Sequence, residues 1–114
     1  QGHQVVLHAR NSGRAADVEL TLATDRIVFA PTATGHLAAI NFAIFLNGAG
    51  RTGEVGQRWG KVDVNVSADR MEVIRRDGFT FTVRVNVRQR PQRAQVIVYD
   101  YGSDLIGALT VQVR

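Results

Sequence analysis

Apolar and polar residues alternate with a period of two along most of the chain, which is the pattern of half-buried β-strands. The clearest case is residues 79–88, where aromatic and valine side chains occupy every second position. Turn residues such as Asn, Gly and Pro separate the alternating segments. The predicted strands span residues 4–10, 17–23, 27–29, 37–46, 54–66, 79–88, 94–100 and 105–113.

The period changes at residues 67–76, where the pattern predicts one short helix. Ser67 is its predicted N-cap, because a hydroxyl can accept a hydrogen bond from a free main-chain N–H. Gly78 is placed to end the helix in a left-handed conformation. We expect Met71 and Ile74 to face the sheets, with Val73 as a further candidate.

Seven or eight strands, one short helix and regularly spaced turns predict an all-β fold. A two-sheet antiparallel sandwich, Ig-like in the broad sense, fits best, and a small barrel is the alternative. The length of 114 residues fits one domain. Residues 1–3 resemble the remnant of a cleaved affinity tag, so we assign the domain to residues 4–114 and expect a fragment of a longer protein.

Composition narrows the functional classes only slightly. Apolar residues make up 45% of the chain and cysteine is absent, which excludes disulfides, thiolate metal sites and a cysteine nucleophile. No apolar run is long enough to span a membrane as a helix. The net charge is +4 and 13 of the 14 basic residues are arginine. A scattered basic surface is commoner than a nucleic-acid site, so charge alone does not predict one.

Candidate chemical motifs do not predict catalysis or a cofactor. Residues 48–53 read G-x-G-x-x-G, but a strand-like segment follows where a dinucleotide site needs a helix. His8 on a polar strand face and His36 in a predicted loop have no nucleophile-elbow serine to serve. Residues 100–104 hold too few oxygen ligands for a calcium loop. We therefore expect no catalytic residues, no metal and no cofactor.

The central strand, residues 37–46, is apolar on both faces. One face belongs to the core, but the other is too apolar for open water. That second face carries Ala39, Asn41, Ala43 and Phe45. Either the helix at residues 67–76 covers it, or it is a docking surface for another domain or protein.

Arginines suggest a second type of surface. Arg84, Arg88, Arg90 and Arg93 could form a basic stripe on the outer face of one sheet, with Arg58 and Trp59 nearby. Trp59 could then stack on a base or a sugar ring. A solvated face of extended arginine side chains is the other interpretation.

The last third of the chain resembles the C-terminal β-rich region of bacterial von Willebrand factor A-related exported proteins. The resemblance rests on Asp77-Gly78-Phe79-Thr80-Phe81, on Val83-Arg84-Val85-Asn86-Val87, on Gln95-Val96-Ile97-Val98-Tyr99-Asp100, and on the closing Leu109-Thr110-Val111. It implies a non-catalytic sandwich in the periplasm or outside the cell. The metal-adhesion motif D-x-S-x-S of the A domain is not in this chain, so no metal role carries over.

Two functional hypotheses follow from these observations. The first is a non-catalytic accessory domain of an exported bacterial protein, which contacts a neighbouring domain or another surface protein through the second face of the central strand. The alternative is a nucleic-acid or polyanion-binding module that uses an arginine-rich strand face.

Overall fold

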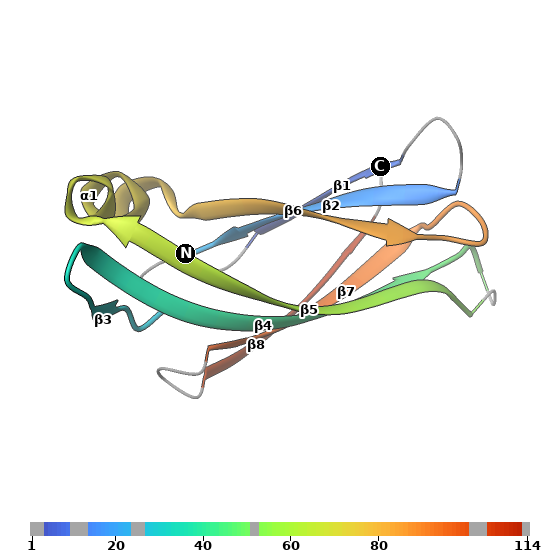
Figure 1. Ribbon diagram of the computed structural model, residues 1–114. Coiled ribbons are helices and arrows are strands. Elements are labelled where there is room, and N and C mark those ends of the chain that lie inside the picture. The colour runs from blue at the N-terminus through green and yellow to red at the C-terminus, as the bar shows by residue number, and fades with distance from the viewer. Residues whose placement is uncertain (1–3, 10–13, 24–26, 51–52, 101–104, 113–114) are drawn as a thin grey trace.

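The computed structural model describes residues 4–9, 14–23, 27–50, 53–100 and 105–112. Their elements confirm an all-β sandwich of two antiparallel sheets with one helix (Figure 1). The predicted tag remnant, residues 1–3, lies outside this part. The elements are β1 (Gln4–Ala9), β2 (Ala15–Leu22), β3 (Ala30–Pro31), β4 (Gly35–Asn47), β5 (Glu54–Ser67), α1 (Ala68–Asp77), β6 (Phe79–Asn86), β7 (Arg93–Asp100) and β8 (Leu105–Gln112).

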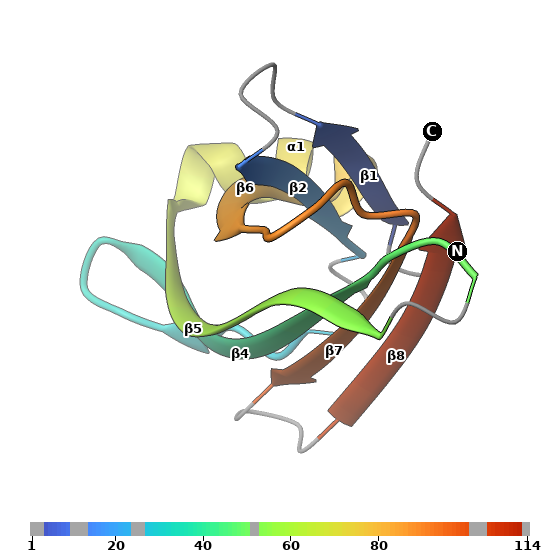
Figure 2. The same ribbon diagram turned by 90° about the vertical axis from the view of Figure 1, so that its right-hand side faces the viewer.

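The strand order is that of an Ig-like sandwich. One sheet has three strands in the order β1-β2-β6. The other sheet has five strands. Strand β4 pairs with β5 along one edge and with β7 and the short β3 along the other edge, and β8 pairs with β7. In constant-type Ig domains the fourth long strand pairs with the fifth. Here the corresponding fourth long strand, β5, pairs instead with β4 in the other sheet. Figure 2 shows the two sheets facing each other.

Strict alternation fills the core between the sheets. Along β2 every second side chain is fully buried, from Ala16 to Leu22, and the inward side chains of β6 lie against them. The inward face of β4 supplies Ala38, Ile40, Phe42, Ile44 and Leu46. Burial of such branched side chains is the main force that holds the sheets together. Each inner face therefore follows the period-two pattern of the sequence.

Helix α1 covers one end of this core rather than the outside of a sheet (Figure 1). Met71 and Ile74 are buried in the core cluster, as predicted, whereas Val73 is exposed and does not face the sheets. Gly78 ends the helix with a φ of 84°, and its N–H donates to the Ile74 carbonyl at 2.7 Å. Ser67 is the N-cap by position, but its hydroxyl makes no capping bond, so that part of the prediction is wrong.

Two local predictions around the start of β4 are also wrong. The short strand lies at Ala30–Pro31 and not at residues 27–29. The main-chain N–H of Val28 instead donates to the buried Asp100 carboxylate at 2.8 Å, which holds this segment outside a strand ladder. His36 lies within β4, paired with Val66, and not in a loop.

The glycine-rich segment forms the turn of the β4–β5 hairpin. The N–H of Gly48 donates to the Gly53 carbonyl at 3.2 Å, and strand β5 follows. A phosphate site would need helix N–H groups at this point. The register shifts beside Leu46 and Asn47, which leaves Val55 as the extra residue next to Gly56. Residues 51 and 52 of the motif lie outside the described part.

Candidate interaction surface

Side chains of three neighbouring strands meet on the outer face of the five-stranded sheet. The register places Ala43 of β4 between Trp59 of β5 and Ile97 of β7. In the next row Asn41 lies between Lys61 and Tyr99. Because the β4 side chains are smaller than their neighbours, they form the floor of a groove. We call this surface, lined by Asn41, Ala43, Trp59, Lys61, Ile97 and Tyr99, the outer groove; its volume is about 530 Å³.

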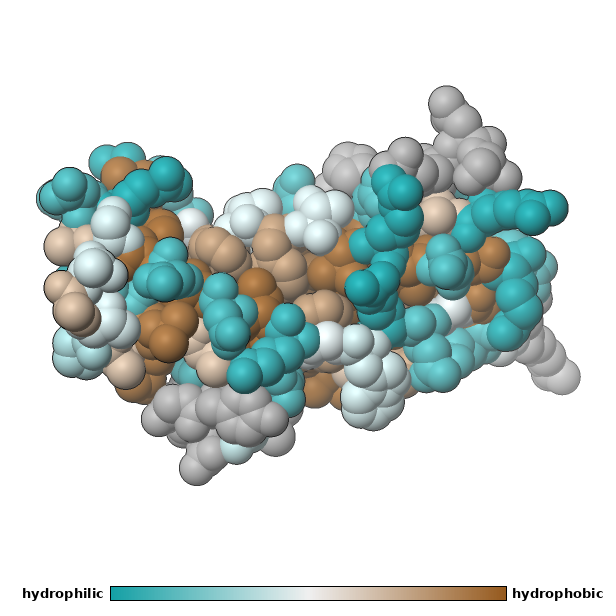
Figure 3. Space-filling view, viewed as in Figure 1, coloured by the Kyte–Doolittle hydropathy of each residue, from teal (hydrophilic) through white to brown (hydrophobic). Residues whose placement is uncertain are grey.

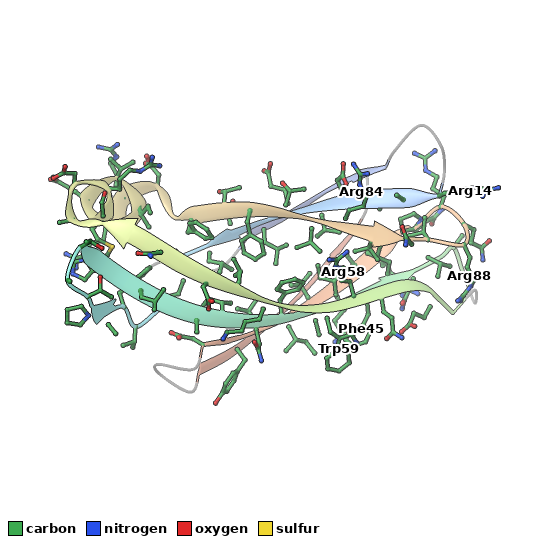
Figure 4. All side chains as sticks on the ribbon, viewed as in Figure 1. Arg14, Phe45, Arg58, Trp59, Arg84 and Arg88 are labelled. Atoms are coloured by element: carbon green, nitrogen blue, oxygen red, sulfur yellow. The ribbon has the colours of Figure 1, made fainter. Side chains whose placement is uncertain are left out.

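Trp59 dominates the outer groove. Trp59 is 69% exposed, which is the highest value among the exposed large hydrophobic residues of the described part. The Trp59 and Phe45 rings lie edge to face, with a centroid distance of 5.8 Å and an interplanar angle of 86°. Figure 4 shows both rings on the side of the sheet that points away from the second sheet. Such an edge-to-face pair holds the indole in one orientation without burying it.

The helix does not cover this face. Its buried residues, Met71 and Ile74, belong to the core between the sheets. Of the two possibilities open from the sequence, coverage of the second face of residues 37–46 by the helix is therefore wrong. On that face Ala43 is the cross-strand partner of Trp59 and Phe45 contacts the Trp59 ring. Ala39 lies further along β4, opposite Asp63.

The predicted arginine stripe is divided between the two sheets. Arg84 lies on the outer face of β6, where its Nε is 3.3 Å from an Asp17 carboxylate oxygen. Arg88 and Arg90 follow β6, and Arg93 begins β7 in the other sheet. These four residues therefore do not share one strand face, because the chain crosses between sheets after Arg88.

Trp59 is likewise separated from Arg84. Trp59 lies on the outer face of the five-stranded sheet and Arg84 on the outer face of the three-stranded sheet (Figure 4). The fold therefore does not place Trp59 and Arg84 on one surface.

Arg58 is the arginine that the structure brings beside Arg84. It pairs with Ile44, whose side chain is buried, so Arg58 lies on the inner side of β5 at the sheet edge. Its Nη1 crosses to the other sheet and donates to the Arg84 carbonyl at 3.1 Å. The Arg88 guanidinium donates to the Glu54 carbonyl, and the main-chain N–H of Arg88 donates to the Val55 carbonyl at 2.9 Å. Arg58 and Arg88 thus connect the edges of β5 and β6.

Sequence reasoning missed Lys61, Ile97 and Tyr99 as groove residues. Alternation along β7 predicts that the side chains of Ile97 and Tyr99 point away from the core. Their position beside Asn41 and Ala43 depends on which strands pair, and a period of two does not contain that information.

No group of three or more His, Asp or Glu side chains that could hold a metal occurs among the described residues. No helix there is long and apolar enough to cross a membrane. The His8 side chain and residues 101–104 of the possible calcium loop lie outside the described part.

Comparison with known proteins supports the fold. No model of a known protein family matches the chain, and no curated protein matches it in sequence. The crystal structure of hypothetical protein PH1083 from Pyrococcus horikoshii OT3 is similar, with a TM-score of 0.53 at 13% sequence identity. The similarity covers 100% of this chain and 88% of that protein. At this identity the likeness concerns the architecture alone.

Proposed function

We propose that this chain is a non-catalytic interaction domain that binds a protein partner through the outer groove. The partner would be a neighbouring domain of the same protein or another surface protein. The observation that carries the proposal is the 69% exposure of Trp59 beside Phe45 on an uncovered part of a sheet. The resemblance to exported von Willebrand factor A-related proteins supports a location in the periplasm or outside the cell.

The composition of the outer groove fits a protein interface. Trp and Tyr are the residues most enriched among those that contribute most of the binding free energy, and the centre of an interface is poor in charge. Here Trp59, Ile97 and Tyr99 surround the small Ala43, and Lys61 lies toward one end. Lys61 is 3.6 Å from Asp63, so its charge is partly offset at the rim. A partner side chain can enter above Ala43 and contact aromatic rings on the way.

Position-specific crosslinking tests this proposal. A photoreactive phenylalanine analogue is introduced at Trp59 in the protein in its native host, and at Thr82 as the control. Thr82 is exposed on the opposite face of the sandwich. We expect one partner to crosslink from position 59 and not from position 82.

The captured partner is then purified and its affinity for the chain is measured. We expect Trp59→Ala to weaken binding by at least tenfold, since removal of such a residue typically costs about 2 kcal/mol or more. The melting temperature should change little, because the ring is largely exposed. Equal crosslinking from both positions, or unchanged affinity of Trp59→Ala, would contradict the proposal.

The second candidate function is polyanion binding. The set of Arg84, Arg88, Arg90, Arg93 and Trp59 does not form one surface, as described above. The observation that favours a narrower version is the proximity of Arg58, Arg84 and Arg88 at one edge of the sandwich.

A further inference from the structure

The sandwich has an open side between the edges of β5 and β6. Among the described strands, β5 pairs only with β4 and β6 only with β2. The two edges meet at one end, where the Arg88 N–H reaches the Val55 carbonyl. At the other end helix α1 lies between them (Figure 1). Along this side the interior is closed by side chains and not by a strand.

Part of this open side is basic. Figure 4 shows Arg84, Arg58 and Arg88 near the edges of β6 and β5, with Arg14 close to the same end. Arg58 and Arg88 are held by main-chain carbonyls of Arg84 and Glu54. Those acceptors fix the guanidinium groups but carry no negative charge, so the positive charge stays available. Asp17 is the carboxylate paired with Arg84.

The other part of the open side is a pocket with one apolar wall and one polar wall. The pocket, of about 610 Å³, lies between the end of β5, the start of β6 and the helix. The apolar wall is formed by Val66, Val73, Ile74 and Phe79. The polar wall is formed by Asn65, Ser67, Arg70, Asp77 and Thr80, and Asp77 pairs with Arg76. Figure 3 shows a hydrophilic band that crosses this face from β6 to β5, next to an apolar area on the side of the helix.

The spacing of the two parts suits an extended peptide. Arg84 and the pocket residue Thr80 are four positions apart on β6, which is about 13 Å along a strand. An extended segment with an acidic side chain at one end and an apolar side chain four residues away would reach both. Arginine is well suited to the acidic side chain because its fork of donors matches a carboxylate.

We propose that the open side between β5 and β6 binds an extended acidic segment of a protein partner. The carboxylates contact Arg58 and Arg88, and an apolar side chain enters the pocket beside Phe79. This surface is separate from the outer groove, and the inference deepens the second candidate function, polyanion binding, by naming the partner as an acidic peptide. A nucleic acid matches this surface less well, because Trp59 lies on another face and one wall of the neighbouring pocket is apolar.

Binding of a labelled copolymer of glutamate and tyrosine tests the proposal by fluorescence anisotropy. The Arg58→Gln/Arg88→Gln variant is compared with Arg75→Gln/Arg93→Gln, which loses the same charge elsewhere. We expect affinity at low salt to fall about tenfold in the first variant and less than twofold in the second, from the loss of two exposed charge pairs. Equal losses would overturn the proposal, since binding would then be a property of net charge.

Five further measurements keep the result specific. The copolymer should bind more tightly than polyglutamate, which lacks the apolar side chain, and more tightly than a thymidine 12-mer. Tighter binding of the 12-mer with the same arginine dependence would replace the peptide with a nucleic acid. Trp59 fluorescence should stay unchanged, which separates this surface from the outer groove. Circular dichroism establishes that both double variants are folded, and Arg58→Lys, which keeps the charge but not the fork, should bind more weakly than the unaltered protein.

Discussion

At the residue scale, Gly60 shows how the core reaches the edge of the five-stranded sheet. Gly60 pairs with Phe42, whose ring is buried and tilts against Phe81 at a centroid distance of 5.8 Å. A Cβ at position 60 would lie 2.4 Å from the Phe42 ring. The ring occupies the space that a side chain would need, so glycine at this position is part of the packing.

The Gly60→Ala substitution should therefore destabilise the protein. The Phe42 ring would have to move within a close-packed core, which costs about 1–3 kcal/mol of unfolding free energy. Gly53→Ala is the matched control, because a Cβ there meets no atom within 4 Å. Urea denaturation of both variants measures the difference. Equal stability of the two variants would show that Phe42 does not pack over Gly60.

At the element scale, the helix is defined by its two buried side chains. Met71 and Ile74 lie on one face in the core, while Val73 is 43% exposed. The difference in burial follows from the helical period and not from hydrophobicity, since Val73 is as apolar as Met71. The helix therefore closes the end of the sandwich with a narrow stripe.

Ile74→Ala should destabilise the protein by about 2–4 kcal/mol, because it leaves a cavity between the helix and the sheets. Val73→Ala removes two methyl groups from a neighbouring position that is largely in solvent, and should change stability by less than about 0.5 kcal/mol. Equilibrium denaturation distinguishes the two. Similar losses for both would mean that the helix packs differently.

Most strands and the helix could be predicted from the sequence, because strands alternate with a period of two and the helix breaks that alternation. The three apolar residues 27–29 were misread as a strand because a short apolar run does not reveal that its main chain bonds to the distant Asp100. The candidate surface was readable in part. Alternation placed Ala43 and Phe45 on the face opposite the core, but strand pairing was needed to bring Trp59 beside them. The arginine stripe failed for the same reason, since linear proximity does not assign residues to sheets.

At the scale of the whole molecule, the sandwich offers two separate surfaces. The outer groove lies on the broad face of the five-stranded sheet. The arginines and the neighbouring pocket lie along the open side between β5 and β6. Arg58 belongs to the second surface and its neighbour Trp59 to the first, because successive residues of a strand point to opposite faces. A partner could occupy one surface and leave the other free.

Exposure of Trp59 in the isolated protein tests the central claim most directly. The chain contains one tryptophan, so its fluorescence reports this position alone. We predict emission at the long wavelength of a hydrated indole and strong quenching by acrylamide, close to that of free tryptophan. Phe45→Ala should change the quenching little. Short-wavelength emission that resists acrylamide would show that the outer groove is covered, and would contradict its assignment as the binding surface.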